Sequence, residues 1–336
     1  MKSVLSFAVA AGLALSSSAA FAQAYPWKPE RPVTIIVPWA AGGSTDQMAR
    51  IVASELEAEL GQKFTVVNQP GASGSVGTKN ALDAPKDGYT WAAGAAADIG
   101  TYRVLGLLDS GLQDWNLFFA NANVTAIAAN PGAPFKDFGQ FLEVMKQRGA
   151  SVPISTAGLS SAGHNFMESV KTNSKIEYRH VTYDGGAPAV TAAVSGEVQA
   201  VAQLLVEMSE HIKAKRLVPL AVLADKPVPL AGYGTLEPTT KWLPNMPAPM
   251  NYFGIWAPKG VPENVIKTME MAWERKIKNS DALKKYGEQR SSLITPIHGK
   301  EAHDEAFKMV RFTAWLYHDA GKSKVSPDTV GIPRLQ

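Results

Sequence analysis

Short runs of β-branched and other apolar residues alternate along this chain with longer stretches in which apolar residues recur every three or four positions. The first run, Val33 to Val37, is almost continuously apolar, which fits a strand that is buried on both faces. In the stretch from Ser44 to Leu60, Met48, Val52 and Leu56 fall on one helical face. This alternation is typical of βαβ units, and it predicts an α/β protein with mainly parallel sheets covered by helices.

The same alternation continues to the end of the chain and predicts further elements. We expect strands over residues 64–67, 152–156, 176–181, 198–204, 217–223 and 252–257. We expect helices that start at residue 163, end at residue 194, and span residues 262–278, 280–289 and 299–317. Residues 226–249 hold too many prolines for a helix or a central strand, so we expect them to be a connection.

The tail of the chain indicates how many lobes there are. One strand followed by three helices cannot form a sheet domain of its own, so we expect the tail to return and cover the first lobe. The chain would then cross between two lobes near Asn121 to Asn130 and near Ala224 to Leu230. The predicted lobe 1 comprises residues 23–125 and 225–336, and the predicted lobe 2 comprises residues 126–224.

Three glycine- or serine-rich loops join a predicted strand to a predicted helix. They are Gly42 to Thr45, Gly71 to Gly74 and Ser160 to Gly163. Such a loop presents unpaired backbone N–H groups and the positive end of a helix dipole, which together attract an anion. Each loop taken alone could be only a capped turn. Three of them at the carboxyl ends of neighbouring strands predict an anion-binding site, because open α/β sheets bind ligands there.

Aromatic and acidic residues flank these loops. Trp39 and Tyr183 could close over the apolar body of a ligand, or they could be core residues. Asp46 falls in the first turn of its helix and is expected to stabilise the helix dipole. Asp184 would repel an anion unless it accepts hydrogen bonds from an amine or a hydroxyl group.

The sequence contains no clear motif for a catalytic site or a metal-binding site. The segment Gly158 to His164 resembles a nucleophile elbow, but the G-x-S-x-G pattern needs glycine where Ala162 stands. A secreted hydrolase that uses Ser160 or Ser161 therefore stays as the alternative. The six histidines show no compact ligand spacing, so we expect neither a catalytic residue, nor a metal ion, nor a cofactor.

The N-terminus has the form of an export signal. Lys2 precedes an apolar stretch, and Ala20 to Ala22 fits the small-x-small cleavage rule. We expect a signal peptide, residues 1–22, that is cleaved after Ala22. A membrane anchor is the alternative, but the serines at 16–18 interrupt the apolar run before it could span a bilayer.

The amino-acid composition excludes several further classes of function. The 336 residues include 33 Lys and Arg against 30 Asp and Glu, a net charge of +3 that argues against nucleic-acid binding. The chain has no cysteine, which excludes disulfides, thiolate metal sites and a cysteine nucleophile.

Several ordered blocks of the sequence resemble one known family. They include Tyr25 to Pro32, Ile36 to Asp46, Val67 to Gly74, Asp87 to Thr90, Ser155 to His164, His180 to Ala189, and Trp256 to Pro262. With these blocks the chain resembles the periplasmic receptors of tripartite tricarboxylate transporters, also called Bug receptors. The resemblance covers essentially the whole chain after the predicted signal peptide.

This resemblance implies a periplasmic-binding-protein type II fold (a Venus flytrap), with two lobes, two crossovers and no enzymatic activity. It implies a receptor, expected to be a periplasmic monomer, that traps a small organic carboxylate by hinge closure and delivers it to a two-component membrane permease. Carried over residue by residue, the implied binding residues are Trp39, Ala41, Gly42, Gly43, Ser44, Thr45, Gly71, Ala72, Ser73, Ser160, Ser161, Tyr183, Asp184 and Gly185.

The chain departs from the family pattern at two places. Many relatives have two prolines where Ala40 and Ala41 stand, and relatives often carry lysine at the position of Asp184. These differences affect the identity of the ligand more than the architecture. A sensor subunit that reports ligand to a membrane kinase would use the same pocket and stays as a further alternative.

Overall fold

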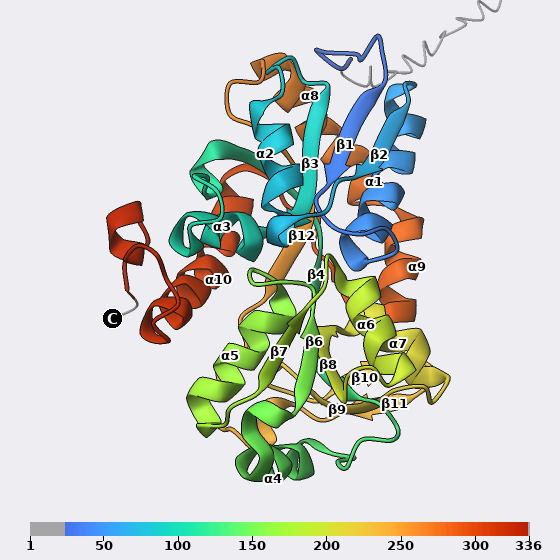
Figure 1. Cartoon of the computed structure of the whole chain (residues 1–336). Coiled ribbons are helices and arrows are strands. Elements are labelled where there is room, and N and C mark those ends of the chain that lie inside the picture. Colours follow the sequence, from blue (N-terminus) through green and yellow to red (C-terminus); the bar gives the residue numbers. More distant parts are fainter. Residues whose placement is uncertain (1–23, 335–336) are drawn as a thin grey trace, which may run out of the picture.

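The computed structural model describes residues 24–334, and these form two lobes, one above the other in Figure 1. Each lobe is a sheet flanked by helices. The predicted signal peptide and its cleavage after Ala22 lie outside the described residues. Within residues 24–334, no helix combines the length and the apolar character needed to cross a membrane.

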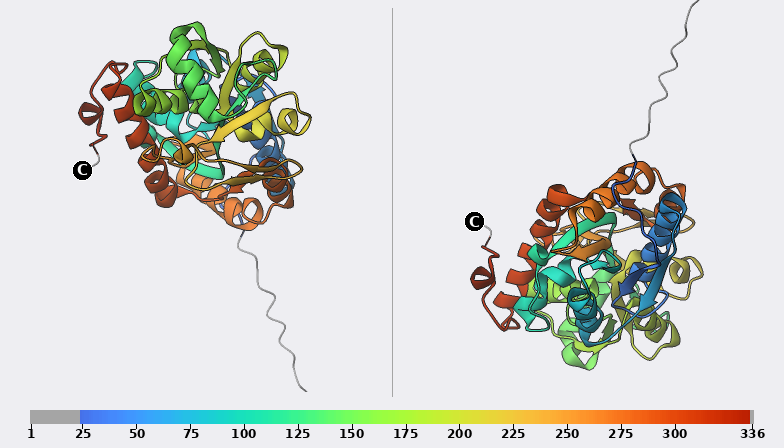
Figure 2. Two further views of the ribbon diagram at one scale, coloured as in Figure 1. Left: turned by 90° about the horizontal axis from the view of Figure 1, so that it is seen from below. Right: turned by 90° about the horizontal axis from the view of Figure 1, so that it is seen from above.

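Lobe 1 is built on a six-stranded sheet with the order β13-β4-β12-β3-β1-β2. Its strands are β1 (Val33–Val37), β2 (Phe64–Asn68), β3 (Thr90–Ala95), β4 (Trp115–Asn123), β12 (Asn251–Pro258) and β13 (Ser292–Ile294). Its helices are α1 (Ser44–Leu60), α2 (Ser75–Asp83), α3 (Ala96–Leu105), α8 (Glu263–Ala272), α9 (Asp281–Arg290) and α10 (Gly299–Asp319). The tail of the chain therefore does return to the first lobe, and Figure 2 shows α10 and the residues after it along one side of the molecule.

Lobe 2 is built on a five-stranded sheet with the order β7-β6-β8-β5-β9. Its strands are β5 (Thr125–Ala129), β6 (Pro153–Thr156), β7 (Arg179–Thr182), β8 (Ala200–Leu204) and β9 (Val218–Val222). Its helices are α4 (Phe138–Arg148), α5 (Ala162–Ser174), α6 (Gly186–Ser195) and α7 (Leu205–Lys213). A separate hairpin pairs β10 (Val228–Leu230) with β11 (Gly234–Leu236).

The predicted two-lobed α/β architecture is confirmed, and both sheets are mixed, because each contains strands that run against the others. In lobe 1, β12 runs antiparallel to β3 and to β4. In lobe 2, β5 runs antiparallel to β8 and to β9. The reason is that β5 and β12 each enter their lobe from the other one. They must run away from the boundary, opposite to the strands whose carboxyl ends face it.

The chain passes between the lobes first at Val124, where β4 ends and β5 begins. After β9 it does not return at once: Leu230 and Leu236 of the hairpin and then Met246 pack into the cores of lobe 2. We therefore propose that the second crossover lies at residues 247–250, later than the sequence pattern suggests. Each hairpin strand has only three residues, and β10 contains a proline, so periodicity does not reveal them.

The core of lobe 1 holds the strand ends in place. Met48, Val52 and Leu56 of α1 are fully buried against the sheet, and burial of each such side chain stabilises the fold by about 1.5–3 kcal/mol. The indole nitrogen of Trp273 donates a hydrogen bond of 2.7 Å to the Phe119 carbonyl oxygen of β4. Helix α1 ends as predicted, with Gly61 in the left-handed conformation (φ 69°).

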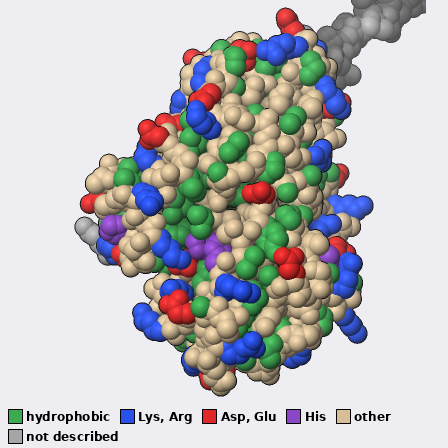
Figure 3. Space-filling view, in the orientation of Figure 1, with side chains coloured by type: hydrophobic (Ala, Val, Ile, Leu, Met, Phe, Trp, Pro, Cys, Tyr) green, Lys and Arg blue, Asp and Glu red, His purple; other side chains and the backbone are tan. Residues whose placement is uncertain are grey.

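The surface carries both signs of charge. On the face shown in Figure 3, Lys and Arg side chains are interspersed with Asp and Glu, without a large patch of one sign.

Candidate functional site

A small cavity of about 30 Å³ lies between the lobes, at the carboxyl ends of strands from both sheets. This is about the volume that one water molecule occupies in the liquid. The lobe 1 residues that line it are Trp39, Gly43, Ser44, Thr45, Ala95, Asp98 and Phe253, and the lobe 2 residues are Ala157, Ser161, Ala162, Gly186, Gln203, Leu204 and Glu207. Five of the sequence-predicted binding residues are thus brought together here: Trp39, Gly43, Ser44, Thr45 and Ser161.

The N-terminus of α1 already binds a carboxylate, but one that belongs to the protein. The Ser44 backbone N–H donates a hydrogen bond of 2.7 Å to Oε1 of Glu207, which lies on α7 in the opposite lobe. Burial raises the pKa of the Glu207 carboxyl, and hydrogen bonds from Ser44 and Gln203 oppose that rise. The helix dipole favours negative charge at this position, as the sequence pattern predicts.

Two glycines leave room for this carboxylate. A Cβ atom at Gly186, the first residue of α6, would lie 2.1 Å from Oε2 of Glu207. A Cβ atom at Gly43 would lie 3.1 Å from Oε1. The Glu207 side chain therefore fills the space between the N-termini of α1 and α6.

The second glycine loop contacts lobe 2 through Ser73. Its hydroxyl oxygen accepts a hydrogen bond of 2.9 Å from the Leu159 N–H, and its carbonyl oxygen accepts one of 3.0 Å from the Ser160 hydroxyl. Gly71 and Ala72, the other predicted residues of this loop, do not line the cavity, and Ala72 is exposed. The loop thus joins the two lobes near the cavity rather than forming its wall.

The serines of lobe 2 act as caps and lobe contacts. The Ser161 hydroxyl donates a hydrogen bond of 2.7 Å to the Gly158 carbonyl oxygen. The Ser161 hydroxyl oxygen also accepts a hydrogen bond from the His164 N–H at the start of α5. The ring Nδ1 of His164 lies 2.7 Å from the Leu159 carbonyl oxygen. Because both hydroxyls donate to backbone carbonyls, this geometry gives no support to a serine–histidine catalytic pair.

The segment Tyr183 to Gly185, whose residues the resemblance implies for binding, meets lobe 1 through its backbone. The Asp184 carbonyl oxygen accepts a hydrogen bond of 2.8 Å from the Ala40 N–H. Gly185 has a φ of 152°, and a Cβ atom there would lie 2.9 Å from the Ala40 nitrogen. Tyr183 is directed elsewhere, because its hydroxyl donates to Glu197 within lobe 2.

Two residues of the first loop are exposed rather than enclosed. Ala41 and Gly42 are exposed to solvent, and the Gly42 N–H donates a hydrogen bond of 2.9 Å to Oδ2 of Asp46. Asp46 also accepts from Asn68 and pairs with Arg50. Burial of Asp46 opposes its ionisation, but the hydrogen bonds from Arg50, Gly42 and Asn68 outweigh it and lower its pKa. This carboxylate orders the loop, in line with the prediction that it stabilises the helix start.

Sequence reasoning missed three polar side chains that line the cavity: Asp98, Gln203 and Glu207. None of them belongs to a glycine-rich loop. Asp98 lies in the first turn of α3, directly after β3, and Gln203 and Glu207 lie at the junction of β8 and α7. Their position after strand ends is the signal that could have found them, but β3 was not among the predicted strands.

A second contact joins the lobes outside the cavity, between α10 and α5. The buried Tyr317 hydroxyl donates a hydrogen bond of 2.6 Å to the Leu159 carbonyl oxygen, and it also contacts Oδ1 of Asn165. Lys322, just after α10, pairs with Glu168 at 2.7 Å. Burial of Glu168 opposes its ionisation, but its bonds with His164 and Lys322 outweigh that effect and lower its pKa to about 2.

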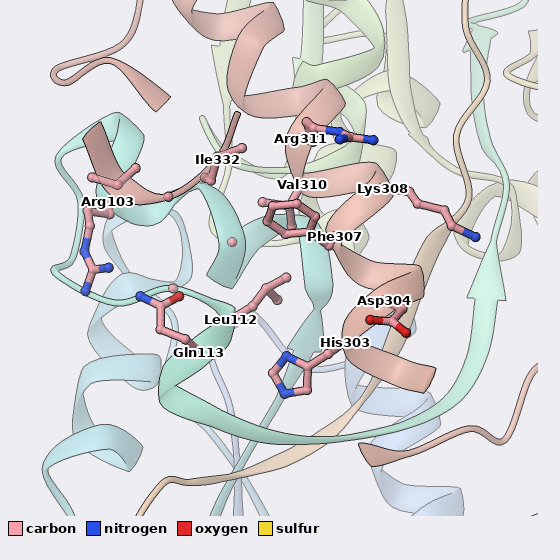
Figure 4. Close-up of a pocket in the computed structure, with 14 residues that line it drawn as sticks. Arg103, Leu112, Gln113, His303, Asp304, Phe307, Lys308, Val310, Arg311 and Ile332 are labelled. Atoms are coloured by element: carbon pink, nitrogen blue, oxygen red, sulfur yellow. The ribbon is translucent and has the colours of Figure 1, made fainter. Parts of the chain in front are cut away.

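A much larger cavity, about 750 Å³, lies elsewhere. It sits in lobe 1, between α10, α3 and the residues near 330–332. In Figure 4, Leu112, His303 and Phe307 point into this space, whereas Lys308 points away from it. No predicted binding residue lines it.

Two lobes joined by short crossovers, with helix N-termini of both lobes around the space between them, define a solute-binding receptor of the periplasmic-binding-protein type. The sequence pattern of the family described as "Tripartite tricarboxylate transporter family receptor" matches residues 48–290. The chain belongs to this family. Its family membership confirms both the resemblance and the interpretation that the protein is a receptor rather than an enzyme.

Individual relatives agree with this placement. The chain is 29% identical to the "UPF0065 protein in tcbD-tcbE intergenic region" of Pseudomonas sp. (strain P51), over 82% of this chain and 83% of that protein. It is 28% identical to protein BugT of Bordetella pertussis, over 71% of this chain and 74% of BugT. It has the fold of the R. palustris protein Rpa4515 solved with adipate, with a TM-score of 0.79, 23% identity, and coverage of 87% of this chain and 98% of that one.

Proposed function

We propose that this chain is a periplasmic receptor that binds a small organic carboxylate between its lobes, closes over it by a hinge motion, and delivers it to a two-component membrane permease of the tripartite type. The observation that carries the proposal is the 2.7 Å hydrogen bond from the Ser44 N–H, at the start of α1, to a carboxylate oxygen. This position accepts a carboxylate, and a cargo carboxylate would take the place of Glu207. The adipate in the similar R. palustris structure supports this ligand class.

The dimensions of the cavity support a hinge. A volume of about 30 Å³ holds one water molecule, so an organic acid can enter only when the lobes move apart. We propose that the lobes turn about the two places where the chain passes between them, at Val124 and at residues 247–250. The contacts that hold the lobes together include the hydrogen bonds of Ser73 and Ala40, and the contact between α10 and α5.

The remaining predicted residues take part through these loops. We propose that the residues that shape the rim that the cargo passes are Ala41, Gly42, Gly71, Ala72, Ser73, Ser160, Tyr183, Asp184 and Gly185. The residues that contact the cargo are Trp39, Gly43, Ser44, Thr45 and Ser161. The receptor acts as an exported monomer after removal of residues 1–22.

Binding is tested by thermal shift and calorimetry on the mature protein with a panel of mono-, di- and tricarboxylates. A ligand that binds only the native state raises its melting temperature. Gly43→Asp places a second carboxylate beside Glu207 and the α1 N-terminus and should abolish binding. Ala58→Asp is the matched control, because it adds the same charge to an exposed position of α1. Equal affinity in the Gly43→Asp variant would remove the site from consideration.

The role in transport needs a separate experiment. Uptake of the labelled carboxylate is compared in cells that carry the permease with and without this receptor. Loss of uptake supports delivery to a permease. Unchanged uptake, together with a transcriptional response that needs the receptor, would favour the sensor alternative instead.

A further inference from the structure

Three side-chain oxygen atoms are buried at one place, on residues that line the cavity between the lobes. They are Oδ1 of Asp98, Oε1 of Gln203 and Oε2 of Glu207, and none has a hydrogen-bond partner among the described residues. The residues Asp98 and Gln203 are 3% and 4% exposed, so bulk solvent does not reach them. Buried acceptors without partners are rare, and each one costs about 1–3 kcal/mol.

The cavity also lacks a positive charge. Its lining residues include two carboxylates but no Lys, Arg or His. Burial raises the pKa of Asp98 well above its usual value and raises that of Glu207 as well. Two acidic groups beside one small cavity favour a positively charged ligand group next to them.

One ligand group matches both features. An ammonium group has three N–H donors, no acceptor and a positive charge. A hydroxyl group donates a single hydrogen bond and brings no charge, and a second carboxylate brings the wrong sign. Backbone N–H donors for a carboxylate lie on the same cavity, at the starts of α1 and α5, where Gly43 to Thr45 and Ser161 to Ala162 line it.

We infer that the cargo carries an ammonium group beside its carboxylate, and that Asp98, Gln203 and Glu207 bind this ammonium group. The inference rests on the proposed function and names its substrate class, the small zwitterionic carboxylates. Helix starts hold the negative end of the cargo, and the three oxygens hold the positive end. The binding energy then includes relief of two buried carboxyl groups, each with one oxygen that lacks a partner, so that selectivity for the ammonium group is built into the free protein.

The test is calorimetry on the mature protein with pairs of compounds that share one carbon skeleton. Each pair contains an ammonium carboxylate and its counterpart without nitrogen: β-alanine and propionate, γ-aminobutyrate and butyrate, and L-aspartate and succinate. n-Butylamine serves as the compound without a carboxylate. In at least one pair, the ammonium member should bind at least about tenfold more tightly than its counterpart, because charge-assisted hydrogen bonds are the strong ones.

The variants Asp98→Asn and Glu207→Gln keep the shape of the side chains and remove their charge. Each should weaken binding of the ammonium member about tenfold or more and narrow its advantage over the counterpart. The exposed Asp225→Asn, which removes the same charge outside the cavity, should leave both affinities unchanged. Two separate variants, each checked by its melting curve, keep the test valid if one of them fails to fold. A shift in the ratio of the two affinities is a result that a merely structural role would not produce.

Two results would overturn the inference. One is that the counterparts without nitrogen bind as tightly as the ammonium members, in which case the proposed carboxylate receptor survives without its ammonium site. The other is that none of the ammonium compounds binds at all. Binding of n-butylamine without any carboxylate compound would instead overturn the proposed function, while it would keep the assignment of the three oxygens.

Discussion

The hydroxyl group of Tyr317 offers a direct measure of how strongly the lobes hold together. The side chain is fully buried on α10 in lobe 1, and its hydroxyl contacts Leu159 and Asn165 of lobe 2. If the lobes separate to admit cargo, these bonds exist only in the closed form. The variant Tyr317→Phe should therefore weaken the closed form without disturbing either lobe.

The size of the effect follows from the partners that are left behind. The Leu159 carbonyl oxygen keeps the His164 ring nitrogen at 2.7 Å, so mainly Oδ1 of Asn165 loses its donor. Loss of this hydrogen bond, which leaves a buried acceptor without its donor, should destabilise the closed form by about 1–2 kcal/mol. Because cargo binds the closed form, its affinity should fall by about 5- to 30-fold.

The assay combines calorimetry with a distance measurement. Affinity is measured for a carboxylate selected by the thermal-shift panel. Since the chain has no cysteine, spin labels at Lys79→Cys and Glu143→Cys report the separation of the lobes. Tyr252→Phe is the control, because its hydroxyl donates to Glu305 within lobe 1. If the affinity and the distances in Tyr317→Phe equal those of the wild type, the contact between α10 and α5 is not part of closure and the reasoning fails.

Three further expectations concern stability. Gly163→Ala places a Cβ atom 1.8 Å from the Ala202 carbonyl oxygen, so it should destabilise lobe 2 by about 3 kcal/mol in urea unfolding, although alanine is the better helix former. The pKa of Glu168, lowered to about 2, means that the native state loses stability as the pH falls below 4.5; thermal melts of Glu168→Gln between pH 5 and 3 should show a shallower loss, and an equal slope would contradict the assignment. The pH dependence that Asp98 causes runs the other way: its pKa is raised in the native state, so the stability of the native state falls as the pH rises above 3.8. The variant Asp98→Asn should remove that decline and raise the melting temperature at neutral pH in the absence of cargo.

Local elements were predictable because short-range physics sets them. The strand Val33–Val37 and the helix Ser44–Leu60 have the bounds that the pattern predicts. Apolar spacing, Pro38 after the strand and Gly61 after the helix are all neighbours in sequence, and each acts on the backbone directly. For the same reason the sequence predicted that the start of this helix would attract a carboxylate.

The large-scale arrangement was only half predictable. The return of the tail followed from the rule that one strand and three helices cannot stand alone. The direction of β5 and β12 did not, because a periodic pattern carries no information about the direction of a strand in its sheet. The hairpin of β10 and β11 likewise remained hidden in a proline-rich segment that reads as a connection.

The chain's own sequence determined the α/β class, the glycine loops and the family, since these depend on residues that lie close together along the chain. Only the tertiary structure brought Glu207 to Ser44, across 163 positions, and placed Asp98 and Gln203 on the same cavity. Contacts between residues so far apart in sequence depend on how the two sheets and the crossovers are arranged in space. In the sequence, an acidic residue that will be buried looks the same as one that stays on the surface, because only the tertiary structure removes water from its carboxyl group.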